Sequence, residues 1–399
     1  MERQFTPKTE IAQRLHRLQT ILQEQNVDGA LILQKADLFY YTGTTQSGWL
    51  YVPAQDDPLF MVFKDLGRAR AESGLDADAV VPLMRPSKIP ETLTGKGIPH
   101  PRVLGMELDV LATSLYFRFV DIFSSAVVED ISPAIRKQRA VKSSHELDLI
   151  RTAAARADQL AAQVPEFIKE GMAEVELAAL LEAHARQNGH QGQINLRLWD
   201  SKLFYGHVLA GDQGGVPGAF ASPTSGSGLN PMVAQGPSFN AIKPHEPVLV
   251  DYVFALDGYL ADHTRIFSLG PLDGELVQAH EDMLEIQAAF VDKARPGVSC
   301  GELYDMMVGM AEAMGHGAYF MGASHPRIRF SGHGIGIELD EFPFIAKGQS
   351  MALEAGMVIA LEPKVVFPGR GAVGIENTFA IHEHGVEKFT RYPDGLCIL

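Results

Sequence analysis

The stretch that decides the fold spans residues 248–262 and reads VLVDYVFALDGYLAD. It carries Asp251 inside an apolar strand, where a carboxylate is costly unless it has a partner or a metal ion. Asp257-Gly258 is a strong signal for a two-residue hairpin turn. Folding about that turn places Val253 opposite Asp262, and Asp251 shares the face of Val253 because side chains alternate along a strand. We therefore expect Asp251 and Asp262 to be diagonal neighbours, about 7–8 Å apart at the backbone. The alternative is a pair of turn or capping acids.

A second pair of acids follows the same pattern near the C-terminus. Residues 359–363 again bury an acid, Glu362, in an apolar strand, and residues 368–371 read as a turn. Reflection about Gly369 places Glu362 opposite Glu376 on the return strand 374–379. This register is less constrained than the first because Pro363 interrupts the ladder.

An imidazole completes the set. His333 lies among the small residues of 331–336, which leave room for a ligand or a metal to approach. Taken alone, such a histidine is an ordinary loop residue, but four carboxylates beside it favour a metal site. Four carboxylates and one imidazole suit Mn, Co, Fe or Zn. Bridging carboxylates would hold two divalent ions about 3.5–4 Å apart, so the sequence predicts a dinuclear centre.

Alternating helix and strand signals organise the first part of the chain. A helix is expected from Ile11, and apolar strands at 30–33, 59–63, 79–81 and 102–106, with a turn at 40–43. Beyond them, Ser143 or Ser144 can cap a long helix, a second helix covers 173–186, and residues 211–228 read as loop. Two further helices are expected at 275–293 and 300–314. We predict an N-terminal α/β domain, 1–140, and a C-terminal α+β domain, 141–399.

Length and charge limit the function. A chain of 399 residues favours two domains, and a formal net charge of −15 argues against nucleic acid or an anionic membrane as partner. Two cysteines are too few for a disulfide framework, and no segment has the ~18 apolar residues needed to span a bilayer. The N-terminus lacks the apolar stretch of a signal peptide, so a cytoplasmic setting is expected.

With these motifs in hand, the chain resembles the pita-bread metallopeptidases, which include prolidase, aminopeptidase P, methionine aminopeptidase and their relative creatinase. Residues 40–43 resemble a Tyr-Leu-Thr-Gly signature, and Asp-x10-Asp-x-Thr-Arg at 251–265 resembles the segment of the first two ligands. The resemblance implies an α+β fold with an N-terminal creatinase-like domain and a C-terminal pita-bread catalytic domain. It implies five metal ligands, with Glu362 also the general base: Asp251, Asp262, His333, Glu362 and Glu376.

The sequence departs from proline-cleaving relatives around these ligands. Arg329 and Asp340 stand where those relatives carry histidines, and Gly374 stands where they often carry an arginine. Arg329 could pair with a substrate carboxylate, and Asp340 could orient an amine or act as a base. The loop with Trp199, Phe204, Tyr205 and His207 could line a substrate pocket; the alternative is that these aromatics are simple core.

The leading hypothesis is a metal-dependent aminopeptidase or dipeptidase that acts on a small peptide, possibly at Xaa-Pro bonds. The second is a creatinase-like amidinohydrolase or a lyase on a small carboxylated metabolite, which would suit Arg329 and Asp340. The third is a non-catalytic scaffold that has kept the fold. Family members of this length are often homodimers, so a homodimer is expected.

Overall fold

A computed structural model describes residues 3–197, 201–218, 222–323 and 327–399. The chain divides into two compact units, Met1–Arg139 and Ala140–Leu399. Trp199 lies outside the described residues. Within the described ranges, no helix combines the length and the apolar character that crossing a bilayer requires.

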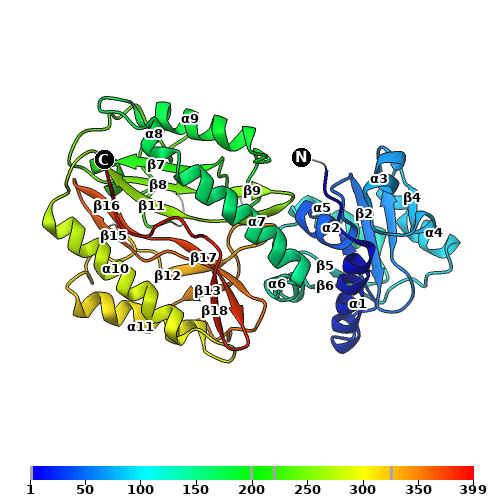
Figure 1. Cartoon of the computed structure of the whole chain (residues 1–399). Helices are drawn as coiled ribbons and strands as arrows, with labels where there is room; N and C mark the ends of the chain where they lie inside the picture. The colour runs from blue at the N-terminus through cyan, green and yellow to red at the C-terminus, as the bar shows by residue number, and fades with distance from the viewer. Residues whose placement is uncertain (1–2, 198–200, 219–221, 324–326) are drawn as a thin grey trace. The chain divides into compact units, whose positions relative to one another are not determined.

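The N-terminal unit is built on one six-stranded sheet in the order β4-β3-β2-β1-β5-β6 (Figure 1). The pairs β1–β5, β5–β6 and β3–β4 are parallel, whereas β2 is antiparallel to both of its neighbours. The strands are β1 (Gly29–Ile32), β2 (Gly48–Pro53), β3 (Leu59–Val62), β4 (Val80–Pro82), β5 (Val103–Met106) and β6 (Val127–Asp130). The helices are α1 (Lys8–Glu24), α2 (Lys35–Thr42), α3 (Leu66–Glu72), α4 (Ile89–Gly95), α5 (Thr113–Ile122) and α6 (Ser132–Ala140).

The expected strands and the first helix are present in this unit, but the turn predicted at 40–43 is wrong. Residues 40–42 are the last residues of α2, and Gly43 caps the helix with a φ of 80°. A left-handed cap is a position that glycine fills without steric cost. The aromatic pair Tyr40 and Tyr41 is buried, so burial in the core stabilises a helix where the local signal suggested a turn.

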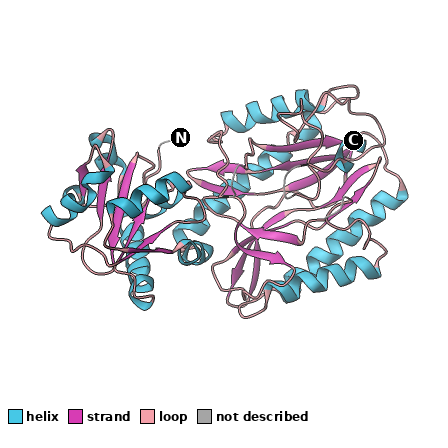
Figure 2. Cartoon of the chain, turned by 180° about the vertical axis from the view of Figure 1, so that it is seen from behind, coloured by secondary structure: helices cyan, strands magenta, loops and turns pink. Residues whose placement is uncertain are grey.

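The C-terminal unit places its strands between two groups of helices (Figures 1 and 2). On one side α7 packs on β9 and β10, and α9 packs on β7; on the other side α10 packs on β15 and β16, and α11 packs on β13. The helices are α7 (Ser144–Ala161), α8 (Val164–Phe167), α9 (Glu174–Gln187), α10 (Gly274–Lys293) and α11 (Cys300–Ala313). The predicted cap of α7 is confirmed: the Ser143 hydroxyl accepts from the Glu146 N–H in a capping box.

The strands of this unit form several sheets, with the orders β19-β11-β8-β7 and β13-β12-β14-β17-β18 in the larger two. The first of these sheets contains β7 (Gly206–Ala210), β8 (Val248–Tyr252), β11 (Thr264–Ser268) and β19 (Cys397–Ile398). The second contains β12 (Phe330–Gly334), β13 (Glu341–Ala346), β14 (Val358–Leu361), β17 (Asn377–His382) and β18 (Gly385–Lys388). Two smaller sheets have two strands each: β9 (Phe254–Leu256) with β10 (Tyr259–Ala261), and β15 (Lys364–Phe367) with β16 (Gly371–Gly374).

Both predicted hairpin registers are found. Tyr259 pairs with Leu256 and Thr264 with Asp251, which is the register that sets Asp262 opposite Val253. Asp257 and Gly258 have φ values of 50° and 87°, as a type I′ turn requires. In the second hairpin Lys364 pairs with Gly374 and Leu361 with Asn377, which is the register that sets Glu362 opposite Glu376.

The strands are interrupted where the ligand candidates lie. Asp262 falls between β10 and β11, Glu362 between β14 and β15, and Glu376 between β16 and β17. The sequence predicted Asp262 and Glu376 inside strands, and that part of the prediction is wrong; the interruption at Glu362 agrees with the break expected from Pro363. At each break the backbone leaves one sheet and enters another, so the acids lie where the sheets meet.

Candidate metal centre

Five side chains predicted from separate segments gather in the C-terminal unit. Asp251 comes from the end of β8 and His333 from β12, while the other three come from the strand breaks. Asp262, His333, Glu362 and Glu376 are each at most 5% exposed, and Asp251 is only partly covered. Thr264 ties the two hairpins together, because it pairs with Asp251 on one side and bridges to Glu376 on the other.

One part of the cluster is arranged to hold a cation. Asp262, His333 and Glu376 each offer a ligand atom within 4.8 Å of the others. The His333 Nε2 lies 3.9 Å from Asp262 Oδ2 and 3.8 Å from Glu376 Oε1. The Nδ1 lies 3.1 Å from the Gly334 carbonyl, which can only accept, so we place the proton on Nδ1. The Nε2 lone pair is then free to bind a metal.

The other part of the cluster already contains a cation. Lys364 Nζ donates to Asp251 Oδ2 at 3.1 Å, to Glu362 Oε2 at 2.9 Å and to Glu376 Oε2 at 2.8 Å. The Lys364 side chain is 1% exposed. A buried ammonium is costly unless it is paired, and here each of its three N–H groups reaches a carboxylate.

Thr264 and Arg265 hold Glu376 in place by hydrogen bonds to its carboxylate and its carbonyl. The Thr264 hydroxyl donates to Glu376 Oε2 at 2.8 Å. The Arg265 guanidinium is buried and donates to six acceptors at 2.7–2.9 Å. These acceptors are the carbonyls of Thr264, Glu376, Tyr392 and Pro393 and the side chains of Asn377 and Asp394. The Thr-Arg pair of the motif therefore fixes the backbone and the carboxylate of Glu376.

Burial and crowding of like charges perturb these acids. Burial, with the charges of Glu376 and Asp251, raises the pKa of Asp262 well above its usual range. Burial raises the pKa of Glu376 to about 7, even though Lys364 acts in the opposite direction. Burial alone would lower the pKa of His333, but Asp340, Glu362 and Glu376 outweigh it and raise the pKa. Acids held together in this way resist full ionisation until a cation joins them.

The Lys364 ammonium is held in its charged form by the same acids. Burial acts to lower the pKa of Lys364, but the charges of Asp251, Glu362 and Glu376 raise it well above its usual value. These neighbouring carboxylates therefore favour the protonated ammonium.

The predicted substrate residues have different environments. His207 pairs with Asp251 across β7 and β8, is buried, and has no hydrogen-bond partner for its Nε2 among the described residues. Burial lowers the pKa of His207, so the ring is neutral at pH 7. Asp340 Oδ1 lies 3.6 Å from Nδ1 of His333, on the side away from the cluster's other acids. Arg329 is exposed, and its carbonyl accepts from the Lys347 N–H.

Sequence reasoning missed Lys364, although a signal for it exists. Positions 362 and 364 lie two apart and therefore share a face of an extended chain. A lysine that opens the apolar run Lys364-Val365-Val366-Phe367 is as unusual as the acid before it. The same reflection that paired Glu362 with Glu376 also places Lys364 beside both.

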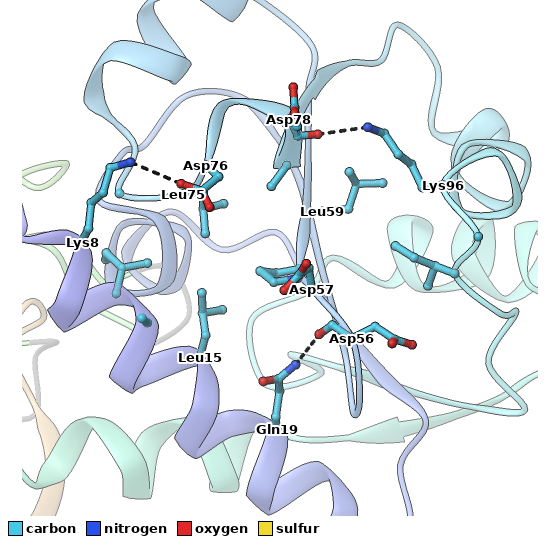
Figure 3. A pocket seen from close by; sticks show the side chains of 17 residues that line it. Lys8, Leu15, Gln19, Asp56, Asp57, Leu59, Leu75, Asp76, Asp78 and Lys96 are labelled. Carbon is cyan, nitrogen blue, oxygen red and sulfur yellow. Dashed lines mark hydrogen bonds and ion pairs between the residues drawn. The ribbon is translucent and has the colours of Figure 1, made fainter.

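A pocket of about 980 Å³ lies in the N-terminal unit and contains none of the five residues (Figure 3). Several of its polar groups are bonded within the unit: Lys8 to Asp76 at 3.3 Å and Lys96 to the Asp78 carbonyl at 3.0 Å. Its lining is mixed apolar and polar, with no convergent set of metal-ligand atoms found there among the described residues.

Two family models match this chain. Residues 148–383 match metallopeptidase family M24, and residues 14–141 match the creatinase/prolidase N-terminal domain. The matches follow the two units of the structure, and the first spans all five residues of the cluster.

Individual relatives cover nearly the whole chain. An Xaa-Pro dipeptidase of Pyrococcus furiosus is 26% identical over 379 residues, 95% of this chain and 98% of the relative. An uncharacterized peptidase of Bacillus subtilis is 27% identical over 389 residues, 97% of this chain and 100% of the relative. The solved structure of an Xaa-Pro dipeptidase from Bacillus anthracis superposes with a TM-score of 0.81 at 23% identity, covering 98% of this chain and 100% of that one. That likeness shows the fold.

Proposed function

The chain belongs to metallopeptidase family M24, and from this premise we propose that it is a metal-dependent dipeptidase or aminopeptidase that acts on small peptides, including Xaa-Pro peptides. The family makes it a metal-dependent peptidase; the substrate and the residue roles below are part of the proposal. The observation that carries it is the buried donor set of Asp262, His333 and Glu376.

The donor set fits a divalent ion. Two carboxylates and one imidazole are ligands that Mn, Co, Fe and Zn accept, and the three groups are buried and preorganised. When bound, the ion supplies Lewis-acid polarisation of the scissile carbonyl. Manganese is the ion we would test first, since the oxygen-rich set suits a hard cation.

We assign the proton transfer to Glu362. Its Oε2 accepts from Lys364 at 2.9 Å, so we assign proton transfer to Oε1. There it would take the proton of the attacking water and return it to the leaving amine. The resemblance implied this role, and the short link to Lys364 supports it by holding the carboxylate in one orientation.

Three other residues are assigned roles by position. The unpartnered Nε2 of His207, beside Asp251, would bind the peptide backbone. Asp340 would orient His333 from its Nδ1 side rather than bind an amine, because it lies 3.6 Å from that nitrogen. Arg329, which is exposed, would pair with the C-terminal carboxylate of a dipeptide.

A dipeptide panel with matched variants tests the proposal. The purified chain loaded with Mn²⁺ or Co²⁺ should hydrolyse dipeptides, lose turnover in a chelator and regain it when the ion is restored. Asp262→Asn should abolish metal-dependent turnover. Asp257→Asn is the matched control, because Asp257 is exposed at the tip of the same hairpin and asparagine accepts its φ of 50°.

The comparison of Xaa-Pro with Xaa-Ala substrates tests specificity. A wild-type protein with no metal-dependent turnover on the panel, or with the same turnover as Asp262→Asn, would overturn the proposal.

A homodimer and a cytoplasmic location stay predictions, for light scattering and cell fractionation to test. The amidinohydrolase, lyase and scaffold alternatives are not favoured, because the matched relatives include Xaa-Pro dipeptidases and dipeptidases.

A further inference from the structure

We infer that the Lys364 ammonium takes the place of one of the two metal ions, so that the centre binds a single divalent ion at Asp262, His333 and Glu376. This inference rests on the proposed metal-dependent function and revises the two-ion expectation drawn from the resemblance. Its basis is that one side chain of the chain itself already supplies a cation to three of the five acidic and imidazole groups.

Glu376 divides the cluster into two cation positions. Its Oε1 faces His333 Nε2 at 3.8 Å, while its Oε2 faces Lys364 Nζ at 2.8 Å. A carboxylate that bridges two metal ions offers one oxygen to each. Here one oxygen is offered toward the imidazole and the other to an ammonium, so Lys364 stands where the second ion would bind.

The Glu376 oxygen on the lysine side is already saturated. Glu376 Oε2 accepts from both Lys364 and the Thr264 hydroxyl, at 2.8 Å each. A carboxylate oxygen has two lone pairs in its plane, and both are used. One oxygen of Asp251, Oδ2, and one of Glu362, Oε2, also accept from Lys364. A metal ion could enter there only by displacing a buried positive charge.

The backbone is shaped to hold this lysine. Lys364 is directly paired with Gly374, and a Cβ at position 374 would lie 2.7 Å from Lys364 Cα and 3.0 Å from its Cγ. The absence of a side chain at Gly374 therefore makes room for the lysine stem. The φ of Gly374 is +145°, a value that L side chains rarely adopt. The hairpin thus fixes the position of the Lys364 side chain, unlike that of a flexible lysine on the surface.

Charge balance agrees with one metal ion. Four carboxylates carry four negative charges, and Lys364 neutralises one of them within a buried site. A single divalent ion leaves one negative charge, whereas two divalent ions leave one positive charge and set three cations side by side in the buried cluster. Like charges in a buried site repel more strongly than in water.

Metal stoichiometry tests the inference without reference to activity. The apo protein would be dialysed to equilibrium against Mn²⁺, and bound metal counted by mass spectrometry while electron paramagnetic resonance reports whether the ions are coupled. We expect one Mn²⁺ per wild-type chain with an uncoupled spectrum. Lys364→Ala should bind two, with the spectrum of an exchange-coupled pair. Asp262→Asn should bind none with high affinity.

Lys142→Ala is the matched control. Lys142 is also a buried lysine paired with a carboxylate, Glu341 Oε2 at 3.0 Å, but it does not reach the five-residue cluster. It should keep one ion per chain. Lys364→Met, which keeps most of the side-chain volume, serves if the alanine variant does not fold, and it should raise the affinity for added Mn²⁺ at the vacated position.

The outcomes separate this inference from the proposed function. Two coupled ions in the wild-type protein would overturn the inference and leave the peptidase proposal standing. One ion in both the wild type and Lys364→Ala would also overturn it, since the lysine would not be what excludes the second ion. One uncoupled ion in the wild type without peptidase turnover would support the inference and overturn the proposed function.

Discussion

Replacing Arg265 with methionine should destabilise the C-terminal unit by about 3–5 kcal/mol, the usual cost of removing one partner from a buried charged network. The substitution removes six hydrogen bonds, one of which is also the ion pair to Asp394 at 2.9 Å. At about 1 kcal/mol net for each bond the loss would reach ~6 kcal/mol. The Glu376 carbonyl still accepts from the Thr264 N–H at 3.3 Å, and the Thr264 carbonyl from the Glu376 N–H at 3.4 Å, so we adopt the lower range.

Arg265→Lys distinguishes the contribution of the positive charge to stability from that of the planar guanidinium donors. Lysine keeps the positive charge but has three donors on one atom instead of a planar fork, so about half of the loss is expected, roughly 2 kcal/mol. Both variants should also weaken Mn²⁺ binding by at least tenfold, because the Arg265 fork holds the Glu376 backbone. Replacing a residue that hydrogen-bonds to a metal ligand commonly weakens metal binding about 10–100-fold.

The assay is urea unfolding of the chelated protein, with hydrogen exchange at β11 and β17 to report on the C-terminal unit alone. Arg391→Met is the matched control, because that side chain is 72% exposed and its nearest carboxylate, on Glu387, lies 4.0 Å away. It should change the free energy of unfolding by less than about 0.5 kcal/mol. An Arg265→Met protein within about 1 kcal/mol of wild type at an unchanged m-value would refute the reasoning.

Three further changes follow from the same structure. Thr264→Val removes the hydroxyl that donates to Glu376 and should weaken Mn²⁺ binding about 10–100-fold in calorimetry, whereas Thr264→Ser should not. Gly374→Ala should lower the free energy of unfolding by about 2 kcal/mol or more, and so lower the melting temperature, because of its φ of +145° and its close neighbours. Gly274→Ala, with open space around it, should not. His190 is held neutral by burial, which lowers its pKa to about 4, so the protein should lose about 2 kcal/mol of stability as pH falls from about 6.5 to 4, where the unfolded histidine gains a proton first. His190→Gln should remove that part of the pH dependence in urea titrations, and an unchanged slope would contradict it.

The sequence by itself determined the hairpins and the residues that meet on them. The Asp257-Gly258 turn and the alternation of side chains fix one register, because a shift by one residue would turn every side chain to the other face. The same argument about Gly369 placed Glu362 opposite Glu376. Local chemistry was sufficient here because turn and strand lie within about twenty residues of each other.

The tertiary structure decided how the two hairpins and His333 share one site. The breaks in the strands at Asp262, Glu362 and Glu376 arise where the chain passes from one sheet to another, and no local pattern carries that information. The helical conformation of residues 40–42 was likewise decided by burial of the two tyrosines. Long-range packing overrides a local turn signal when the buried side chains are large.

Lys364 shows the same division most clearly. Its place on a face with Glu362 follows from the sequence, because strand alternation requires it. Its place beside Glu376 follows from the same hairpin, but its contact with Asp251 requires a second hairpin, more than a hundred residues away in the chain, to be brought against the first. The sequence supplied the acids of the centre, and only the packing of the sheets determined which cation lies among them.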